Sequence, residues 1–209
     1  MKKGFFLTLL AVAAVSLFAQ TRLPEYHFAS GSWSFSGERL YQNDARARLA
    51  KINFRLPQSG LMLYEFDARY ESGAEDGHGG VGLHIFADSA LNRASWGAGR
   101  SYLLWLNYDE RPINRDIPSG LSAQVYRSYT NSRMDLVQSF DLNRYTGLLT
   151  RENLAYPVHF KIFADGNTGE VQIYDPTVED TYYVLNLDLP SRGDWIALRT
   201  NGLKASFTR

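Results

Sequence analysis

The chain has 209 residues, of which 22 are Lys or Arg and 22 are Asp or Glu, so its formal net charge is zero. A neutral chain has no broad electrostatic field to attract nucleic acid or anionic lipid, so we expect neither as a partner. The chain has no cysteine, which excludes disulfides, thiolate metal sites, a cysteine nucleophile and an acylated N-terminal cysteine.

The first twenty residues, MKKGFFLTLLAVAAVSLFAQ, have the layout of a secretory signal peptide. Two lysines precede an apolar run from Gly4 to Ala19, which is shorter than the ~20 residues that a membrane-spanning helix needs. We therefore expect residues 1–19 to be removed by cleavage after Ala19, or alternatively after Ser16. The remaining chain would be periplasmic or secreted, without a membrane anchor. A retained anchor is the alternative interpretation.

Beyond the signal, apolar and polar residues alternate with a period of two, which is the pattern of half-buried strands. Leu61–Glu71 shows it most clearly, with apolar side chains at even positions and mostly charged ones at odd positions. We also predict a hairpin of Tyr156–Asp165 and Glu170–Asp175, because a Gly/Asn-rich turn separates them. The other predicted strands are Ser32–Ser36, Ala47–Leu56, Val81–Asp88, Tyr102–Tyr108, Leu121–Tyr129, Met134–Phe140, Tyr182–Leu187, Trp195–Arg199 and Lys204–Thr208.

Glycine-rich stretches at Ser72–Gly80 and Ser89–Arg100 predict long loops, and Asn143–Asn153 predicts one short helical turn. We find no linker, low-complexity tract or internal repeat, so residues 20–209 are predicted to form a single domain. About a dozen short strands separated by turns are typical of an all-β fold, either an antiparallel sandwich or a barrel.

The order of these strands resembles the concanavalin A-like lectin/glucanase superfamily, whose fold is a jelly-roll sandwich. The resemblance covers most of residues 26–209 and is one of pattern. It rests on a strand pair around Ser32-Trp33-Ser34 and Phe54-Arg55-Leu56, on LMLYEFDARYE followed by GGVGLHIF, on SYLLWLNYD, and on HFKIFADGNTGEVQIYD followed by GDWIALRTNG-LKASFTR. It implies one convex and one concave sheet, with ligands on the concave face or on loops at its rim.

Glucanases of this superfamily carry Glu-x-Asp-x-Glu or Glu-x-Asp-x-x-Glu on one strand, and this chain has Glu65 and Asp67 followed by Glu71, one residue further along. Retaining glycosidases need two carboxyl groups ~5–5.5 Å apart and inverting ones ~6.5–9.5 Å. On an extended strand Glu65 and Glu71 lie about 20 Å apart, and Arg69 would keep Asp67 ionised. Glu65 and Asp67 therefore remain weak catalytic candidates, and a solvated charged face is the favoured interpretation.

Calcium is a second possibility, because carboxylate oxygens are its preferred ligands. Glu75 and Asp76, with Asp88 at the end of the next strand, are the candidate ligands. The sequence has no regular Asp/Asn ladder, so a flexible polar loop without a cofactor is the favoured interpretation.

If the strands at 61–71, 81–88, 102–108 and 121–129 share one sheet, their faces away from the core form one surface. Aromatic rings stack on sugars and polar groups bond to hydroxyls, so this surface predicts a ligand-binding site. Its predicted residues are Glu65, Asp67, Arg69, His84, Trp105, Asn107, Gln124 and Tyr126, with Trp96 at the rim. In the alternative interpretation, Trp105 and Phe86 pack under the loops as a second small core.

The sequence therefore favours an exported, non-catalytic domain of the bacterial envelope or exterior that binds a glycan or an envelope protein. One alternative is a structural or assembly subunit, such as part of a filament sheath. A second alternative is a β-glucan-type glycoside hydrolase. The oligomeric state is left open.

Overall fold

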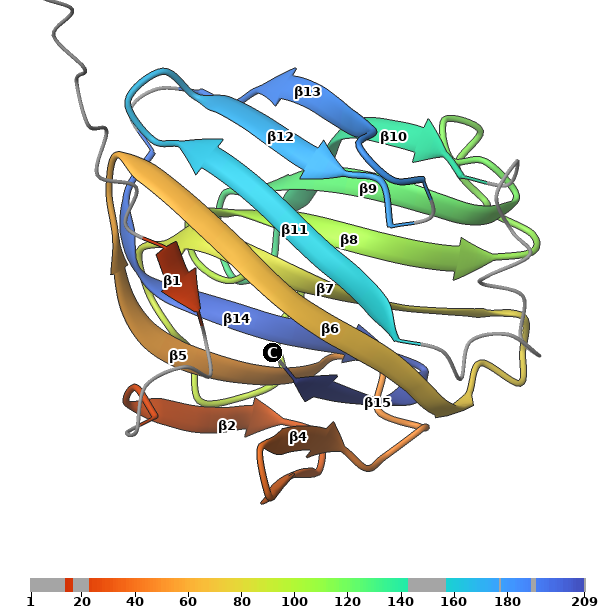
Figure 1. The fold of residues 1–209 in the computed structure, drawn as a ribbon. Coiled ribbons are helices and arrows are strands. Elements are labelled where there is room, and N and C mark those ends of the chain that lie inside the picture. Colours follow the sequence, from red (N-terminus) through yellow and green to blue (C-terminus); the bar gives the residue numbers. More distant parts are fainter. Residues whose placement is uncertain (1–13, 17–22, 143–156, 177, 189–190, 209) are drawn as a thin grey trace, which may run out of the picture.

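The computed structural model describes residues 14–16, 23–142, 157–176, 178–188 and 191–208. These residues form two stacked sheets and contain no helix, which confirms the predicted all-β sandwich (Figure 1). No helix in the described part of the chain is therefore long and apolar enough to cross a membrane. The helical turn predicted at Asn143–Asn153 falls outside the described residues.

One sheet, here called the β6 sheet, has eight strands. Its main path runs β13-β12-β11-β6-β15-β4-β3, with neighbours antiparallel. The strands are β3 (Trp33–Ser36), β4 (Arg39–Gln42), β6 (Leu61–Gly73), β11 (Val158–Asp165), β12 (Glu170–Tyr174), β13 (Tyr182–Asn186), β15 (Leu203–Thr208) and the short β1 (Ala14–Ser16).

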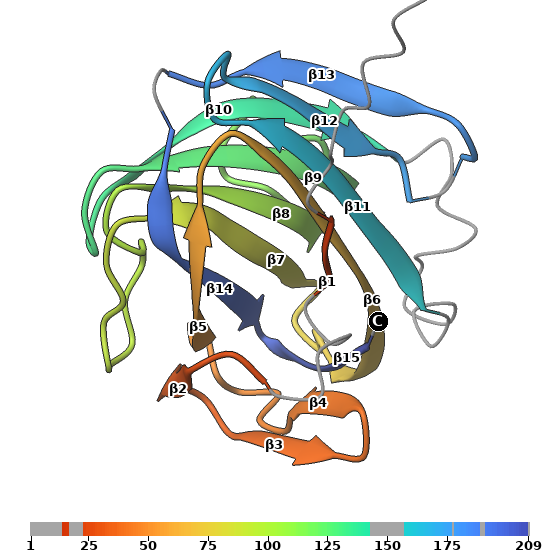
Figure 2. The ribbon, with the colours of Figure 1, turned by 60° about the vertical axis from the view of Figure 1, so that its left-hand side comes forward.

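The other sheet, the β7 sheet, has seven antiparallel strands in the order β10-β9-β8-β7-β14-β5-β2. Its strands are β2 (Tyr26–Ser30), β5 (Ala50–Gln58), β7 (His78–Ala87), β8 (Ser101–Asp109), β9 (Gly120–Ser128), β10 (Met134–Asp141) and β14 (Gly193–Asn201). Figure 2 shows the two sheets facing each other across the core.

The core consists of the inward-facing residues of both sheets. On β6 the even-numbered residues from Met62 to Ala68 are buried, as the alternation predicted. They meet residues of β5 and β7, such as Phe54 and Leu83, which have no exposed surface. The predicted hairpin is also confirmed, because β11 and β12 pair around the turn at Gly166–Gly169.

Several expectations about local structure are wrong. The loop predicted at Ser72–Gly80 is short, because β6 continues to Gly73 and β7 begins at His78. The segments around Trp33 and Phe54 are not a strand pair: β3 pairs with β4 in the β6 sheet, whereas β5 pairs with β2 and β14 in the β7 sheet.

The N-terminal segment contributes one strand within the predicted signal peptide. β1 pairs in parallel with Leu63–Glu65 of β6 (Figure 2). β15 pairs with β6 from Gly73 back to Asp67, and β1 continues this edge along the residues that precede Asp67. Cleavage after Ala19 or Ser16 would remove β1, and this cleavage stays a prediction.

Candidate functional site

A cleft of about 760 Å³ lies at one end of the β7 sheet, where five segments end or begin side by side. β5, β7 and β9 end here, β8 and β14 begin here, and the segment after β13 closes one wall. Its lining includes three aspartates, three arginines and two tyrosines, namely Asp88, Asp188, Asp194, Arg100, Arg127, Arg192, Tyr102 and Tyr129. The cleft is therefore rich in both hydrogen-bond donors and acceptors.

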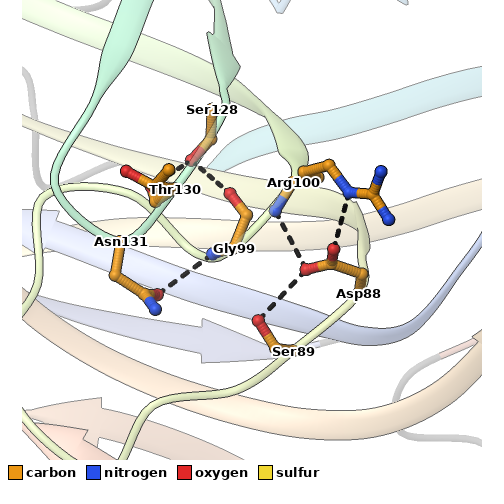
Figure 3. A network of polar contacts seen from close by, with 7 residues as sticks. All are labelled: Asp88, Ser89, Gly99, Arg100, Ser128, Thr130 and Asn131. Atoms are coloured by element: carbon orange, nitrogen blue, oxygen red, sulfur yellow. Dashed lines mark hydrogen bonds and ion pairs between the residues drawn. The ribbon is translucent and has the colours of Figure 1, made fainter.

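Asp88 fixes the position of Arg100 on one wall of the cleft (Figure 3). The Asp88 carboxylate accepts hydrogen bonds from the Arg100 backbone N–H and from its Nε, both at 2.9 Å, and from the Ser89 hydroxyl at 3.1 Å. Burial alone would raise the pKa of Asp88, but these bonds outweigh it and hold the pKa below its usual range. Asp88 therefore stays ionised and keeps the Nε edge of the guanidinium in place.

The terminal nitrogens of Arg100 remain available for a ligand. They have no protein partner among the described residues, and the side chain is 82% exposed. In Figure 3 the contact to Asp88 leaves from Nε, and no dashed line reaches either terminal nitrogen. A guanidinium held in this way presents a planar pair of donors.

The backbone that carries Arg100 is fixed by the turn between β9 and β10. The Ser128 hydroxyl donates to Gly99 O at 2.8 Å, and the Gly99 N–H donates to Asn131 Oδ1 at 3.0 Å (Figure 3). Gly99 has a φ of +54°, and a Cβ there would lie 2.2 Å from Asp88 Oδ1. Only glycine fits this position, so the loop is built to place Arg100 beside Asp88.

Beside Arg100, the end of β9 carries an aromatic ring in contact with two arginines. The Arg127 and Arg133 guanidinium carbons lie 4.7 and 4.8 Å from the centre of the Tyr129 ring. Arg127 also forms an ion pair with Asp188, and the Asp188 N–H donates to the Tyr102 hydroxyl at 3.0 Å. These contacts join the end of β9 to the segment after β13.

The predicted ligand surface is divided between two sheets, so it does not exist as one surface. β6 carries Glu65, Asp67 and Arg69 in the β6 sheet, whereas β7, β8 and β9 belong to the β7 sheet. The prediction assumed that consecutive strands are neighbours, but the chain crosses from one sheet to the other between Gly73 and His78. The two halves of the predicted site therefore face away from each other on opposite sides of the molecule.

On the β6 sheet, the two catalytic candidates both contact His159 of β11. Its Nε2 lies 3.2 Å from Glu65 Oε1 and its Nδ1 lies 2.8 Å from Asp67 Oδ1. Arg69 forms an ion pair with Glu71 at 2.8 Å instead of with Asp67. These side chains make a partly exposed polar surface, and the cleft is not lined by any of them. Catalysis by Glu65 and Asp67 stays a prediction.

On the β7 sheet, most of the predicted residues lie beneath the loop of residues 89–100. His84, Gln124 and Trp105 are 0%, 2% and 8% exposed. Gln124 Oε1 accepts a hydrogen bond from the half-buried Tyr126 hydroxyl, and Asn107 Oδ1 accepts one from the indole N–H of Trp105. Trp96, on the loop itself, is 47% exposed. Trp105 therefore packs under the loop, as the alternative interpretation held, whereas Phe86 has joined the main core.

Two buried cations hold this loop on the sheet. Lys51 of β5 donates to Ser95 O, Ser95 Oγ and Gly97 O at 2.7–3.0 Å. Arg199 of β14 donates to Trp96 O at 2.7 Å. Lys51 and Arg199 are 1% and 2% exposed, and neither has a carboxylate partner among the described residues. Both side chains bind loop carbonyl oxygens where a carboxylate would be the usual partner.

We expect the stability of the protein to rise with pH because of Lys51. Burial, and after it the charge of Arg199, lower the pKa of Lys51 to about 7, whereas the pKa of the unfolded residue is 10.5. Between these values the unfolded chain binds a proton that the folded chain has released. The free energy of unfolding should therefore increase from pH 7 upward, by at most roughly 1.4 kcal/mol per pH unit.

Urea unfolding at pH values from 7 to 10 measures this slope. Above pH 10 Tyr64 lowers the free energy of unfolding as the pH rises, because burial raises its pKa. The measurement therefore ends at pH 10. The neighbouring His84 stays neutral in this range, since burial lowers its pKa. Lys51→Met should remove the slope and Lys204→Met, on the β6 sheet, should keep it. A flat wild-type profile would contradict the prediction.

The three calcium candidates cannot share one ion. Asp76 precedes β7 and Asp88 follows it, and a ten-residue strand spans roughly 30 Å. Asp76 contacts Arg48 and His78 at 2.7 and 3.2 Å, and Glu75 lines the same small cleft as Asp76. No group of three or more potential ligands gathers in the part of the chain that the structure describes.

Sequence reasoning missed the arginines of the cleft, Arg100, Arg127 and Arg192, and the Tyr129 ring. They come from separate segments that form no motif. One signal was available: Asp88 ends a predicted strand and Arg100 lies two residues before the next, so in an antiparallel pair they would lie close together.

No protein-family model and no curated protein matches the sequence. Solved structures do match. The carbohydrate-binding module CBM66 from Bacillus subtilis has a TM-score of 0.60 and 16% identity, over 89% of this chain and 93% of that one. A B. subtilis protein of unknown function with a galectin-like fold has a TM-score of 0.55 and 14% identity, over 88% and 86%. The carbohydrate recognition domain of Emp46p has a TM-score of 0.50 and 11% identity, over 92% and 93%.

These likenesses show the fold. The fold is a two-sheet jelly-roll sandwich like that of concanavalin A-like domains, as the order of its strands predicted.

Proposed function

We propose that this protein is a non-catalytic carbohydrate-binding domain that takes its ligand in the cleft beside Arg100. The observation that carries the proposal is the guanidinium of Arg100, fixed by Asp88 and with its terminal nitrogens free in a cleft of about 760 Å³. Two of the structurally similar proteins are named for carbohydrate binding or recognition, which supports this class of ligand.

The chemistry of the cleft suits a sugar. Neighbouring hydroxyls of a sugar can accept hydrogen bonds from the two terminal nitrogens of Arg100. Asp194 at the start of β14 and Arg192 just before it, both exposed, add an acceptor and a donor.

We further propose that the domain acts outside the cytoplasm. The signal-like N-terminus and the lack of cysteine support export without a lipid anchor. The ligand would then be a glycan of the envelope or of the surroundings. An envelope protein remains the alternative ligand.

The test is binding of the chain without residues 1–19 to a glycan array, followed by calorimetric titration with the best soluble glycan. We expect Arg100→Ala to raise the Kd about tenfold or more, equivalent to roughly 1.4 kcal/mol, since it removes the positioned donors. The melting temperature should barely change, because the side chain is 82% exposed.

Arg46→Ala is the matched control, since Arg46 is an exposed arginine that does not line the cleft. Its affinity should equal that of the wild type. A wild-type protein that binds no glycan would refute the proposed function. Unchanged affinity in Arg100→Ala would refute the proposed site.

A further inference from the structure

Trp96 is an exposed aromatic ring that is held rigidly in place. The Arg199 guanidinium carbon lies 4.7 Å from the centre of the Trp96 ring and 5.4 Å from that of Trp105. Arg199 is 2% exposed, whereas Trp96 is 47% exposed. One face of the Trp96 ring therefore rests on a buried cation, and the other face is left to solvent.

The loop that carries Trp96 is fixed on both sides of the ring. Lys51 binds the carbonyls of Ser95 and Gly97, and Arg199 binds the carbonyl of Trp96 itself. The Gly97 N–H donates to Asn131 O at 3.0 Å. A ligand that stacks on Trp96 would thus lose little free energy to ordering of the loop.

The close packing at Gly97 also shows that the loop position is specific. A Cβ at this residue would lie 2.1 Å from Thr130 O and 2.3 Å from Ser128 Oγ. The same Ser128 hydroxyl bonds to Gly99 O, next to Arg100. The Trp96 ring and the cleft are therefore positioned by one set of contacts.

Trp96 lies near the cleft along the chain. Arg100 is four positions after Trp96 in the sequence, so their Cα atoms are at most about 14 Å apart. A chain of linked sugars that leaves the cleft over the loop can therefore reach the ring.

We propose that Trp96 is a second subsite, a stacking platform for a further sugar unit of a ligand bound in the cleft, so that the ligand is an oligo- or polysaccharide and not a single sugar. This inference rests on the proposed carbohydrate function and adds the class of ligand. Arg199 and Lys51 are positioning residues: they hold the ring and do not touch the ligand.

The test measures affinity against chain length. Cello-, laminari- and xylo-oligosaccharides, from the monosaccharide to the hexasaccharide, are titrated by calorimetry, and a monosaccharide array and insoluble polysaccharides complete the panel. We expect wild-type affinity to increase with length. Trp96→Ala should remove the increase, with a loss of about fivefold or more for the longest ligand that binds and none for the shortest, since the further sugar loses the ring on which it stacks.

Two further variants make the test specific. Trp96→Phe should retain part of the length dependence, because it keeps an aromatic ring. Tyr182→Ala is the matched control: Tyr182 is also 47% exposed, but it lies on the edge strand β13 of the β6 sheet. It should bind every ligand as the wild type does.

The outcomes separate the two proposals. If the wild type binds longer chains better and Trp96→Ala does so equally, the subsite is refuted and the cleft proposal stands. If the wild type binds single sugars as tightly as chains, the subsite is also refuted. If it binds no glycan of any kind, both proposals fail.

Discussion

Replacing Trp105 with alanine is expected to destabilise the fold by about 3–5 kcal/mol, the usual cost of deleting a buried tryptophan. The ring is 8% exposed and lies on two glycines of the neighbouring strand. A Cβ at Gly80 would be 2.4 Å from the ring, and one at Gly82 would be 2.7 Å from it. The truncation would leave a cavity between β7, the Arg199 side chain and the loop above.

Urea unfolding followed by circular dichroism measures this loss. Trp96→Ala is the matched control, because it removes the same side chain from the outer side of Arg199, where it is 47% exposed. We expect its cost to stay below about 1 kcal/mol. Equal costs for the two variants would show that Trp105 does not stabilise the packing beneath the loop.

Replacing Gln58 with leucine is expected to cost about 3 kcal/mol, because it leaves buried polar groups without partners. Gln58 is 2% exposed. Its Oε1 accepts from the Tyr64 hydroxyl at 2.7 Å and from the Phe86 N–H at 2.8 Å, and its Nε2 donates to Trp195 O at 2.7 Å. One side chain thus joins β6 of one sheet to β7 and β14 of the other, at the floor of the cleft.

A double-mutant cycle with Tyr64→Phe measures the free energy of the hydrogen bond between the Tyr64 hydroxyl and Gln58, which joins the two sheets. Tyr64→Phe should cost less in the Gln58→Leu background than in the wild type, since the hydroxyl has already lost its acceptor there. Gln172→Leu serves as the control: Gln172 is half-buried and bonds only to Glu170. Additive costs of Tyr64→Phe and Gln58→Leu would contradict the coupling.

Phe86 shows that the alternation of a strand does not always give the direction of its side chains. Alternation places Phe86 on the outer face of its strand, together with His84. In the structure Phe86 has a φ of +54° and lies in the main core. The backbone N–H bond to Gln58 and the close approach of Gly193, whose Cβ would lie 2.4 Å from Phe86 C, accompany this local reversal. All of these partners are distant in the sequence.

The predicted ligand surface differed from the structure for a related reason. A period of two gives the faces of one strand, and it assigned the buried face of Leu61–Glu71 correctly. It carries no information on which sheet a strand joins. Four residues, Ala74–Gly77, suffice for the chain to cross between the sheets, and this crossing separates Glu65 and Asp67 from Trp105 and Tyr126.

The sequence by itself determined the fold class, most of the strands and the inward faces of β6, β7 and β8, because side-chain alternation and turn chemistry are local properties of the chain. Only the tertiary structure decided how the strands divide between the two sheets and which polar residues are covered. It also decided where the cleft lies, because the cleft is made by strand ends that are far apart in the sequence. Arg100 and Trp96 have their positions through contacts with β5, β14 and the β9–β10 turn, and these long-range contacts leave no pattern in the sequence.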